Sequence, residues 1–195
     1  RAEARQAVSE LRDSGAEVFV GRCDVTVESD VEAILSSIRE NMPPLAGVVQ
    51  AAMVLEDVFI STMTIEQLKK VMEPKVLGSW NLHRYTREDD LDFFLSFSSS
   101  SSLVGNPGQA NYSAGNAFLD ALGVFQRNRG VPGLTIGWGA IGDVGYVSQR
   151  KEIVEHFERQ GVRFISLEQA WRTIAYSLDR EMSHIGLLPV DWRKF

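Results

Sequence analysis

Continuous apolar runs alternate with amphipathic segments along most of the chain. The apolar runs, which are typical of strands buried on both faces, occupy residues 16–25, 45–52, 92–99, 132–139 and 184–190. Segments with apolar residues at helical spacing occupy residues 1–14, 26–41, 64–86, 108–130, 149–161 and 167–180. This alternation predicts an α/β fold, namely a Rossmann-like, doubly wound parallel sheet in three α/β/α layers.

A few residues predict where these elements begin, bend and end. Gly15 and Gly130 follow two of the helical segments and are expected to terminate them. Thr26 or Ser29 is expected to cap the second helix, which has acidic residues in its first turn. Pro74 lies inside the third helical segment and predicts a kink or a break there.

Composition and charge narrow the class of protein. The chain has 195 residues, of which 44% are hydrophobic and 24% charged, so we expect a single folded domain, 1–195. The net charge of −6 argues against nucleic acid or an anionic membrane as a partner. Cys23 is the one cysteine, which rules out an internal disulfide and favours a reducing, cytoplasmic setting. No apolar run approaches the ~18 residues of a membrane span, and no spacing predicts a metal site.

Ligands of such sheets bind beyond the carboxyl ends of the strands. This geometry directs attention to Cys23–Val25, Gln50–Asp57, Ser98–Gly108 and Trp138–Gly145. The last segment overlaps GWGAIG, residues 137–142, which matches the dinucleotide-binding pattern G-x-G-x-x-G. That pattern binds pyrophosphate between a first strand and a helix, whereas this copy follows a late strand and no helix begins inside it. We therefore interpret it as a glycine-rich loop at the sheet edge.

A serine run at residues 98–102 separates a predicted strand from the helical segment with Tyr112 and Asn116. These two residues are four apart and lie on one helix face. Ser99 ends the strand, and Lys75 lies in the preceding helical segment. An ammonium near a tyrosine favours the phenolate and makes the phenol a better proton donor, and a serine hydroxyl stabilises charge on a carbonyl oxygen. Together these groups suit reduction of a ketone by a hydride donor.

Taken singly, each of these residues also has an ordinary structural explanation. Tyr112 suits a helix interface, Lys75 and Asn116 suit solvated helix positions, and Ser99 simply ends a strand. Asp24 and Asp57 would most often cap a helix and start a turn. The joint spacing of the first four residues favours the catalytic interpretation.

Five segments, in order along the chain, resemble the ketoreductase domains of polyketide synthases, in the short-chain dehydrogenase/reductase superfamily. They are CDVT (23–26), GVVQAAMVLEDV (47–58), PKVLGSWNLH (74–83), the stretch from Phe94 to Leu122, and LTIGWGAIGDVGY (134–146). Most short-chain reductases carry Tyr-x-x-x-Lys. These ketoreductases instead resemble one another in having Tyr-x-x-x-Asn with a lysine on the preceding helix, as Lys75, Tyr112 and Asn116 do here.

The resemblance implies a reaction and a role for each residue. Tyr112 would donate the proton, Ser99 would hold the ketone oxygen, and Lys75 and Asn116 would support the tyrosine, the nicotinamide ribose and a proton-relay water. The implied substrate is a β-ketoacyl chain on the phosphopantetheine of an acyl carrier protein, reduced to the β-hydroxyacyl thioester. Other domains of the same synthase would be further partners.

The resemblance also implies NADPH as the hydride donor. Asp24 and Val25 would contact its adenine, and Ala51 and Ala52 would line the path of its ribose and pyrophosphate. The first strand and its glycine-rich loop are expected to lie before Arg1, so the domain is expected to be incomplete at its N-terminus. Without that segment we expect weak NADPH binding.

The expected product is a 3R hydroxyl, as in B-type ketoreductases. Leu55-Glu56-Asp57 stands where B-type enzymes resemble one another in a Leu-Asp-Asp signature, and it keeps the final acid. Val104 replaces the tryptophan of A-type enzymes. The substrate and stereocontrol residues implied by the resemblance are Asp57, Val104, Pro107, Gln109, Asn111 and Trp138, although packing under the sheet edge explains Trp138 equally well.

Two other functions remain open at this point. A degenerate, non-catalytic ketoreductase could serve as a structural module of a megasynthase, but it would not need all four catalytic residues. A free-standing short-chain dehydrogenase acting on a free alcohol would be expected to have lysine in place of Asn116.

Overall fold

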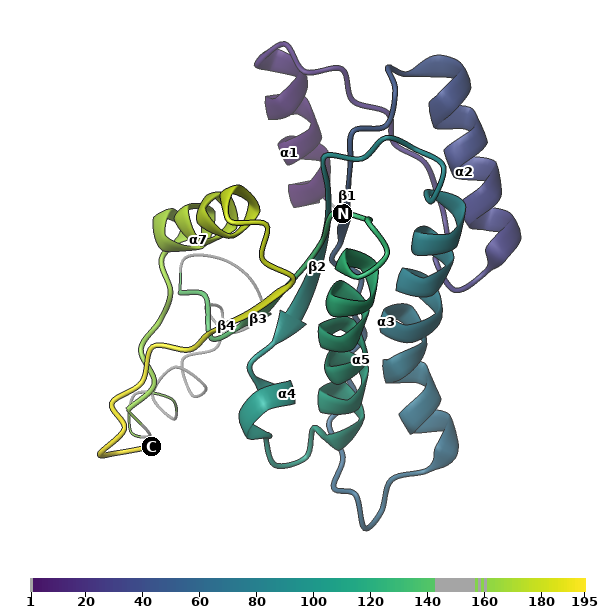
Figure 1. The fold of residues 1–195 in the computed structure, drawn as a ribbon. Coiled ribbons are helices and arrows are strands. Elements are labelled where there is room, and N and C mark those ends of the chain that lie inside the picture. The colour runs from purple at the N-terminus through teal and green to yellow at the C-terminus, as the bar shows by residue number, and fades with distance from the viewer. Residues whose placement is uncertain (1, 143–156, 158, 160) are drawn as a thin grey trace.

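The computed structural model of the chain describes residues 2–142, 157, 159 and 161–195. A sheet flanked by helices forms its centre (Figure 1). The strands are β1 (Gly47–Gln50), β2 (Phe93–Ser99), β3 (Gly133–Trp138) and β4 (His184–Leu187). The helices are α1 (Ala2–Asp13), α2 (Glu28–Asn41), α3 (Ile65–Tyr85), α4 (Ser101–Val104), α5 (Ala110–Arg127) and α7 (Leu167–Asp179).

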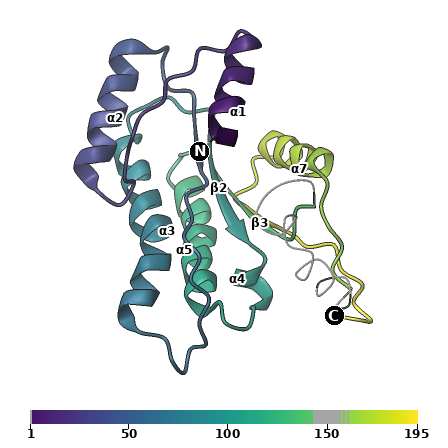
Figure 2. The same cartoon turned by 180° about the vertical axis from the view of Figure 1, so that it is seen from behind.

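The predicted doubly wound parallel sheet is confirmed. The strands lie in the order β1-β2-β3-β4, and each neighbouring pair is parallel. Helix α5, with α3 beside it, covers one face of the sheet, and α7 covers the other, as Figures 1 and 2 show from opposite sides. Because all four strands run the same way, their carboxyl ends meet at one edge.

The two faces of the sheet differ in chemistry. The face toward α7 holds an apolar cluster that includes Leu95, Ile136 and Trp138. The face toward α5 carries small polar side chains, of which the Thr135 hydroxyl donates to the Leu119 carbonyl at 2.8 Å. Gly123 of α5 allows this close approach, because a Cβ there would lie 2.5 Å from the Ser183 carbonyl oxygen. Helix α5, which carries Tyr112 and Asn116, is therefore seated tightly on the sheet.

Helix α3 is continuous through Pro74, so of the predicted kink or break, the break does not occur. A capping box begins the helix: the Thr64 hydroxyl accepts from the Gln67 amide at 3.2 Å, and the Gln67 side chain accepts from the Thr64 amide at 3.0 Å. Buried Val71 and Lys75 lie on either side of the proline. Their packing holds the two halves of the helix together despite the missing N–H.

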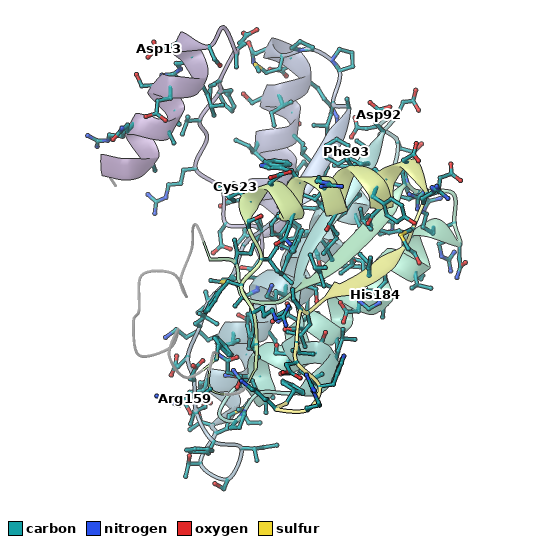
Figure 3. The ribbon with its side chains drawn as sticks, turned by 90° about the vertical axis from the view of Figure 1, so that its left-hand side faces the viewer. Asp13, Cys23, Asp92, Phe93, Arg159 and His184 are labelled. Atoms are coloured by element: carbon teal, nitrogen blue, oxygen red, sulfur yellow. The ribbon has the colours of Figure 1, made fainter. Side chains whose placement is uncertain are left out.

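The strand predicted over residues 16–25 does not form, and this prediction is wrong. The segment belongs to no strand, and Phe19 and Val20 are 46% and 66% exposed. An apolar run becomes a strand only where a neighbouring strand supplies its hydrogen bonds, and none of the four described strands lies beside this run. Figure 3 labels Cys23 in this segment.

Three further predictions concern the cap of α2, the serine run and the helix expected over residues 149–161. The predicted cap of α2 by Thr26 or Ser29 is wrong, because the N-cap is Val27 and the Thr26 hydroxyl donates to Asp24 Oδ1 at 2.7 Å. The serine run at residues 98–102, which separates the predicted strand from the next helical segment, ends β2 at Ser99 and begins the short helix α4 at Ser101. The helix predicted over residues 149–161 lies almost entirely outside the described residues.

Candidate active site

A cavity of about 880 Å³ opens at the carboxyl edge of the sheet. Its walls come from the segment after β1, the end of β2, the end of β3, the N-terminal turn of α5 and the last residues of the chain. The sequence-predicted residues that line it are Ala51, Asp57, Lys75, Ser99, Val104, Pro107, Gln109, Tyr112 and Trp138. The fold therefore brings together three of the four predicted catalytic residues and most of the predicted stereocontrol residues.

Lys75 is the most unusual side chain in the cavity wall. It projects from the middle of α3, is 2% exposed, and its ammonium donates to the Phe97 carbonyl of β2 at 3.0 Å. Burial lowers the pKa of Lys75 to about 8, and the negative charge of Asp120 opposes this shift. A lysine is almost never buried in this way without a structural or functional reason.

Tyr112 stands directly beside this ammonium. Lys75 Nζ lies 5.3 Å from the centroid of the tyrosine ring, and the Tyr112 hydroxyl donates weakly to Met53 Sδ at 3.9 Å. Burial raises the pKa of the phenol, the polar side chains of Asn116 and Ser99 lower it in part, and the charge of Asp57 adds to the rise. The expected lowering of the tyrosine pKa by Lys75 is therefore not found. The Lys75 ammonium points at the Phe97 carbonyl and the face of the tyrosine ring rather than at the phenol oxygen. Desolvation is therefore the main influence on the pKa of Tyr112.

Asn116 lies one helical turn beyond Tyr112 and is fully buried. Its amide nitrogen donates to the Tyr112 backbone carbonyl at 2.9 Å. Its other polar atom, Oδ1, is buried and has no hydrogen-bond partner among the described residues. An unpaired buried acceptor costs free energy, so a bound donor such as a hydroxyl or a water would be stabilised there.

The hydroxyl of Ser99 is oriented by the helix that follows it. Ser99 ends β2, and the Ser101 amide, at the start of α4, donates to Ser99 Oγ at 3.2 Å. Because this oxygen already accepts a hydrogen bond, its own hydrogen is available to a group in the cavity. The serine run is thus a strand end and a helix start, and it supplies a donor at the site.

The loop after β1 is attached to the beginning of α5 by three contacts. The Gln109 amide donates to both carboxylate oxygens of Asp57 at 3.1 Å. The Val58 amide donates to the Gly108 carbonyl at 2.7 Å. Asn111, fully buried behind the cavity wall, donates to the Glu56 carbonyl at 3.0 Å and accepts from the Tyr112 amide at 2.8 Å. Three of the predicted stereocontrol residues, Asp57, Gln109 and Asn111, are therefore connected to the helix start that carries the predicted proton donor.

The residues expected to contact a cofactor are dispersed. Ala51 lines the cavity, whereas Asp24, Val25 and Ala52 do not appear in the lining that the described residues form. The Asp24 carboxylate accepts from the backbone and the hydroxyl of Thr26, which lowers its pKa. The buried, unpaired Asn116 Oδ1 and the Lys75 ammonium fit the hydroxyl-rich nicotinamide ribose end of a dinucleotide.

Trp138 serves packing and also borders the cavity. It is 7% exposed, belongs to the apolar cluster under α7, and its ring lies 5.6 Å from that of Phe97. Its indole N–H is buried without a partner among the described residues. Within residues 137–142, no helix begins, which agrees with the interpretation of GWGAIG as a loop at the sheet edge.

Two residues that contact or influence the site were not predicted from the sequence. Met53 accepts from the Tyr112 hydroxyl, and no local pattern marks a methionine in an irregular loop. Asp120 acts on Lys75, and its carboxylate accepts from the Ser102 hydroxyl at 2.6 Å. The spacing 112, 116, 120, which places three polar residues on one face of α5, could have identified Asp120.

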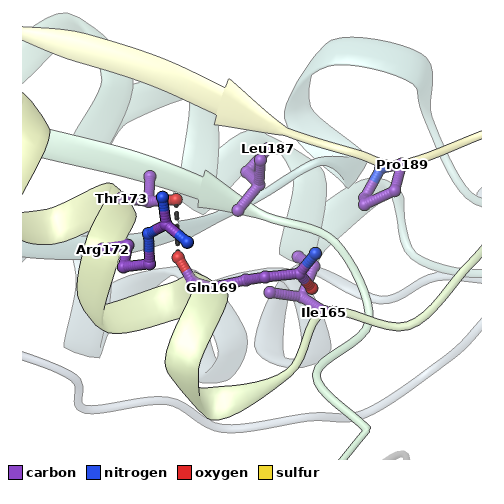
Figure 4. Close-up of a pocket in the computed structure, with 6 residues that line it drawn as sticks. All are labelled: Ile165, Gln169, Arg172, Thr173, Leu187 and Pro189. Atoms are coloured by element: carbon purple, nitrogen blue, oxygen red, sulfur yellow. Dashed lines mark hydrogen bonds between the residues drawn. The ribbon is translucent and has the colours of Figure 1, made fainter.

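A second, smaller pocket lies between α7 and β4, away from these residues. Its volume is about 330 Å³, and Figure 4 shows its lining of Ile165, Gln169, Arg172, Thr173, Leu187 and Pro189. The Thr173 hydroxyl donates to the Gln169 carbonyl at 2.8 Å, as part of the ordinary hydrogen bonding of α7. None of the sequence-predicted site residues lines this pocket.

Comparison with known protein families identifies the fold and its site. The family described as the KR domain matches residues 1–143, which is most of the chain. The chain belongs to the KR domain family. The resemblance to the ketoreductases of polyketide synthases expected from the sequence is thereby confirmed.

Curated relatives of this KR domain are large synthases. It is 42% identical over 162 residues to the highly reducing polyketide synthase tstA of Talaromyces stipitatus, covering 83% of this chain and 6% of that protein. It is 35% identical over 176 residues to the squalestatin tetraketide synthase of a Phoma species, covering 90% of this chain and 7% of that protein. The chain thus spans less than a tenth of the length of these relatives.

Solved ketoreductases share the fold of this KR domain. The first ketoreductase of the tylosin polyketide synthase is 32% identical, with a TM-score of 0.88, over all of this chain and 42% of that chain. An A1-type ketoreductase is 30% identical, with a TM-score of 0.93, over all of this chain and 41% of that one. None of the described helices of the KR domain is long and apolar enough to span a membrane.

Proposed function

We propose that this KR domain reduces a β-ketoacyl thioester, held on the phosphopantetheine of an acyl carrier protein, to the β-hydroxyacyl thioester during polyketide assembly. The observation that carries the proposal is the buried Lys75 ammonium, 5.3 Å from the Tyr112 ring centroid, at the wall of a cavity that Ser99 also lines. The acyl carrier protein and the other domains of a synthase are the partners this reaction requires.

NADPH, when bound, supplies the hydride that adds to the β-carbon. The cavity volume is within the range of small-molecule sites, roughly 300–1,000 Å³. Within this chain, Lys75 and the unpaired Asn116 Oδ1 would hold the nicotinamide ribose. The choice of NADPH over NADH is part of the proposal.

The chain's own residues supply the proton and the charge stabilisation. The Ser99 hydroxyl, whose oxygen already accepts from the Ser101 amide, donates a hydrogen bond to the ketone oxygen. The Tyr112 hydroxyl, which stays protonated because burial raises its pKa, would transfer its proton to that oxygen. The resulting phenolate is stabilised by the side chains of Ser99 and Asn116, which favour the charged form, and is reprotonated from water.

The proposed product has a 3R hydroxyl. Asp57 borders the cavity and is held by Gln109, three residues before Tyr112, so the loop carrying it sits at a fixed place relative to the proton donor. A substrate chain that contacts this loop would present one face of its ketone. The solved relatives include an A1-type ketoreductase, so similarity to them does not favour a B-type product. The proposal of a B-type product is based on the loop after β1, which carries Asp57.

The reaction is tested by following NADPH absorbance in the full polypeptide that carries this chain, with a β-ketoacyl thioester mimic. We expect Tyr112→Phe to lower the rate by about a hundredfold or more, because general acid catalysis typically contributes at least this much. Tyr176→Phe, at an exposed position on α7, is the matched control and should keep the native rate. No NADPH oxidation by the native protein would favour a non-catalytic structural module instead.

A further inference from the structure

Asp120 continues the line of polar residues on the catalytic face of α5. It lies four residues beyond Asn116 and eight beyond Tyr112, so all three share one side of the helix. Its side chain is 13% exposed, and it does not line the cavity that the described residues form. Asp120 therefore stands behind the site without facing the substrate.

The Asp120 carboxylate connects three elements. One oxygen, Oδ2, accepts from the Ser102 hydroxyl of α4 at 2.6 Å. The other, Oδ1, lies 3.3 Å from Nε2 of His184, which begins β4 and is marked in Figure 3. A short hydrogen bond from a hydroxyl to a carboxylate is among the stronger ones in proteins. This carboxylate thus supplies a side-chain hydrogen bond by which α5 holds α4.

Helix α4 in turn orients Ser99. Ser102 Oγ also lies 2.8 Å from the Ser99 carbonyl, and the Ser101 amide donates to Ser99 Oγ at 3.2 Å. A hydroxyl has one hydrogen, and the charged carboxylate is its stronger acceptor. Loss of the carboxylate would leave Ser102 to donate to the Ser99 carbonyl alone and would release the α4 turn, with its Ser101 amide, from α5.

Asp120 also acts electrostatically on Lys75. Its negative charge opposes the burial that lowers the pKa of Lys75 to about 8. Among the described residues, the other ionisable groups in contact with this pair are Tyr112, beside Lys75, and His184, beside Asp120. The charge of Asp57, across the cavity, acts on Tyr112.

We propose that Asp120 is a positioning residue of this site, whose carboxylate fixes Ser102 and α4 so that the Ser101 amide aims the Ser99 hydroxyl at the ketone oxygen. A second effect of the same charge is to keep Lys75 protonated. The inference rests on the proposed ketoreduction, although its geometric part can be tested without turnover.

Three variants in the full polypeptide separate the two effects. Asp120→Ala removes both the acceptor and the charge, and we expect kcat to fall about tenfold, which corresponds to about 1.4 kcal/mol, with KM for NADPH unchanged. Ser102→Ala should lower kcat similarly, and the double variant should lose little more, because both changes break one contact. Asp120→Asn keeps an acceptor for Ser102 and should retain most of kcat at pH 7.

The pH profile distinguishes this role from a merely structural one. Lys75 is charged below its pKa, so activity that needs the ammonium falls as pH rises through that value. Asp120 favours the charged form, so Asp120→Asn should move this fall to lower pH. Glu168→Ala, which removes an exposed carboxylate from α7, is the matched control and should leave kcat and the pH profile unchanged.

Hydrogen exchange tests the geometry independently of activity. The amides of residues 101–105 should exchange faster in Asp120→Ala and Ser102→Ala than in the native protein, and those of α7 should not. Native exchange in both variants would overturn the inference whether or not the protein turns over. Native kcat and pH profile in all Asp120 variants of an active protein would also overturn it, whereas an inactive native protein counts against the proposed function.

Discussion

Lys75 keeps a positive charge in a place where burial opposes it. The ammonium is satisfied by one carbonyl and one carboxylate charge, and its pKa is lowered to about 8. Proteins retain such groups mainly at functional sites, where a perturbed pKa is part of the chemistry. The neighbouring Tyr112 pKa is shifted the opposite way, which keeps the proton donor protonated.

These two shifts predict the pH dependence of the reaction. Lys75 is charged below about pH 8 and Tyr112 remains a phenol beyond its usual range, so Lys75 loses its proton first. We expect kcat/KM for the β-ketoacyl thioester, at saturating NADPH, to fall as pH rises through about 8. A control without enzyme corrects for hydrolysis of the thioester at high pH. Activity that stays level up to pH 10 would show that the lysine charge is not required.

Asp57 is expected to govern the configuration of the product. Asp57→Ala should lower the ratio of 3R to 3S product by about tenfold, since small changes in substrate contacts are worth about 1–3 kcal/mol. Gln109→Leu should act in the same direction, because it frees the Asp57 carboxylate. Chiral chromatography of the product is the measurement, and Asp92→Ala, at an exposed position before β2, is the control. If the ratio of 3R to 3S product were unchanged in both Asp57→Ala and Gln109→Leu, Asp57 would have no role in stereocontrol.

At the scale of elements, α5 matters most because it carries Tyr112, Asn116 and Asp120 and is held close to the sheet by Gly123. Gly123→Ala would place a methyl group 2.5 Å from the Ser183 carbonyl oxygen and 2.7 Å from Thr135 Oγ1. We expect this overpacking to destabilise the fold by about 1–3 kcal/mol and to speed native-state proteolysis.

Gly115 provides the comparison on the same helix. A Cβ there would lie 3.4 Å or more from its neighbours, which is ordinary contact, and alanine is favoured over glycine in helices by about 1 kcal/mol. Gly115→Ala should therefore be cleaved no faster than the native protein. Equal resistance of both variants to proteolysis would mean that α5 does not depend on close contact with β3 and β4.

The elements that the sequence predicted well are those with local signals. The helical periods of α3 and α7 and the apolar runs of β2 and β3 lie within the segments they define. The strand expected at residues 16–25 failed because strand formation needs a partner elsewhere in the fold. Helix α4 was missed because a serine run has no apolar period, and its helix depends on contacts such as that of Ser102 with Asp120.

At the scale of the whole molecule, the site is built from segments distant in sequence. Residues after β1, the ends of β2 and β3, and Lys194 and Phe195 at the end of the chain all border one cavity. The four predicted catalytic residues could be identified because their spacing in the sequence resembles that of a known family. Met53 could not, because its contact with Tyr112 follows only from how the loop after β1 folds over α5.

The transfer of hydride to a tethered ketone is tested most directly by isotope labelling. The full polypeptide would be given a β-ketoacyl chain on its carrier protein and NADPH deuterated at the hydride position, with mass spectrometry of the product. We expect one deuterium on the β-carbon with the native protein and with Tyr176→Phe, and a rate lower by about a hundredfold with Tyr112→Phe. An unreduced chain with the native protein would contradict the assignment of this site. So would Tyr112→Phe if it formed the labelled product at the native rate.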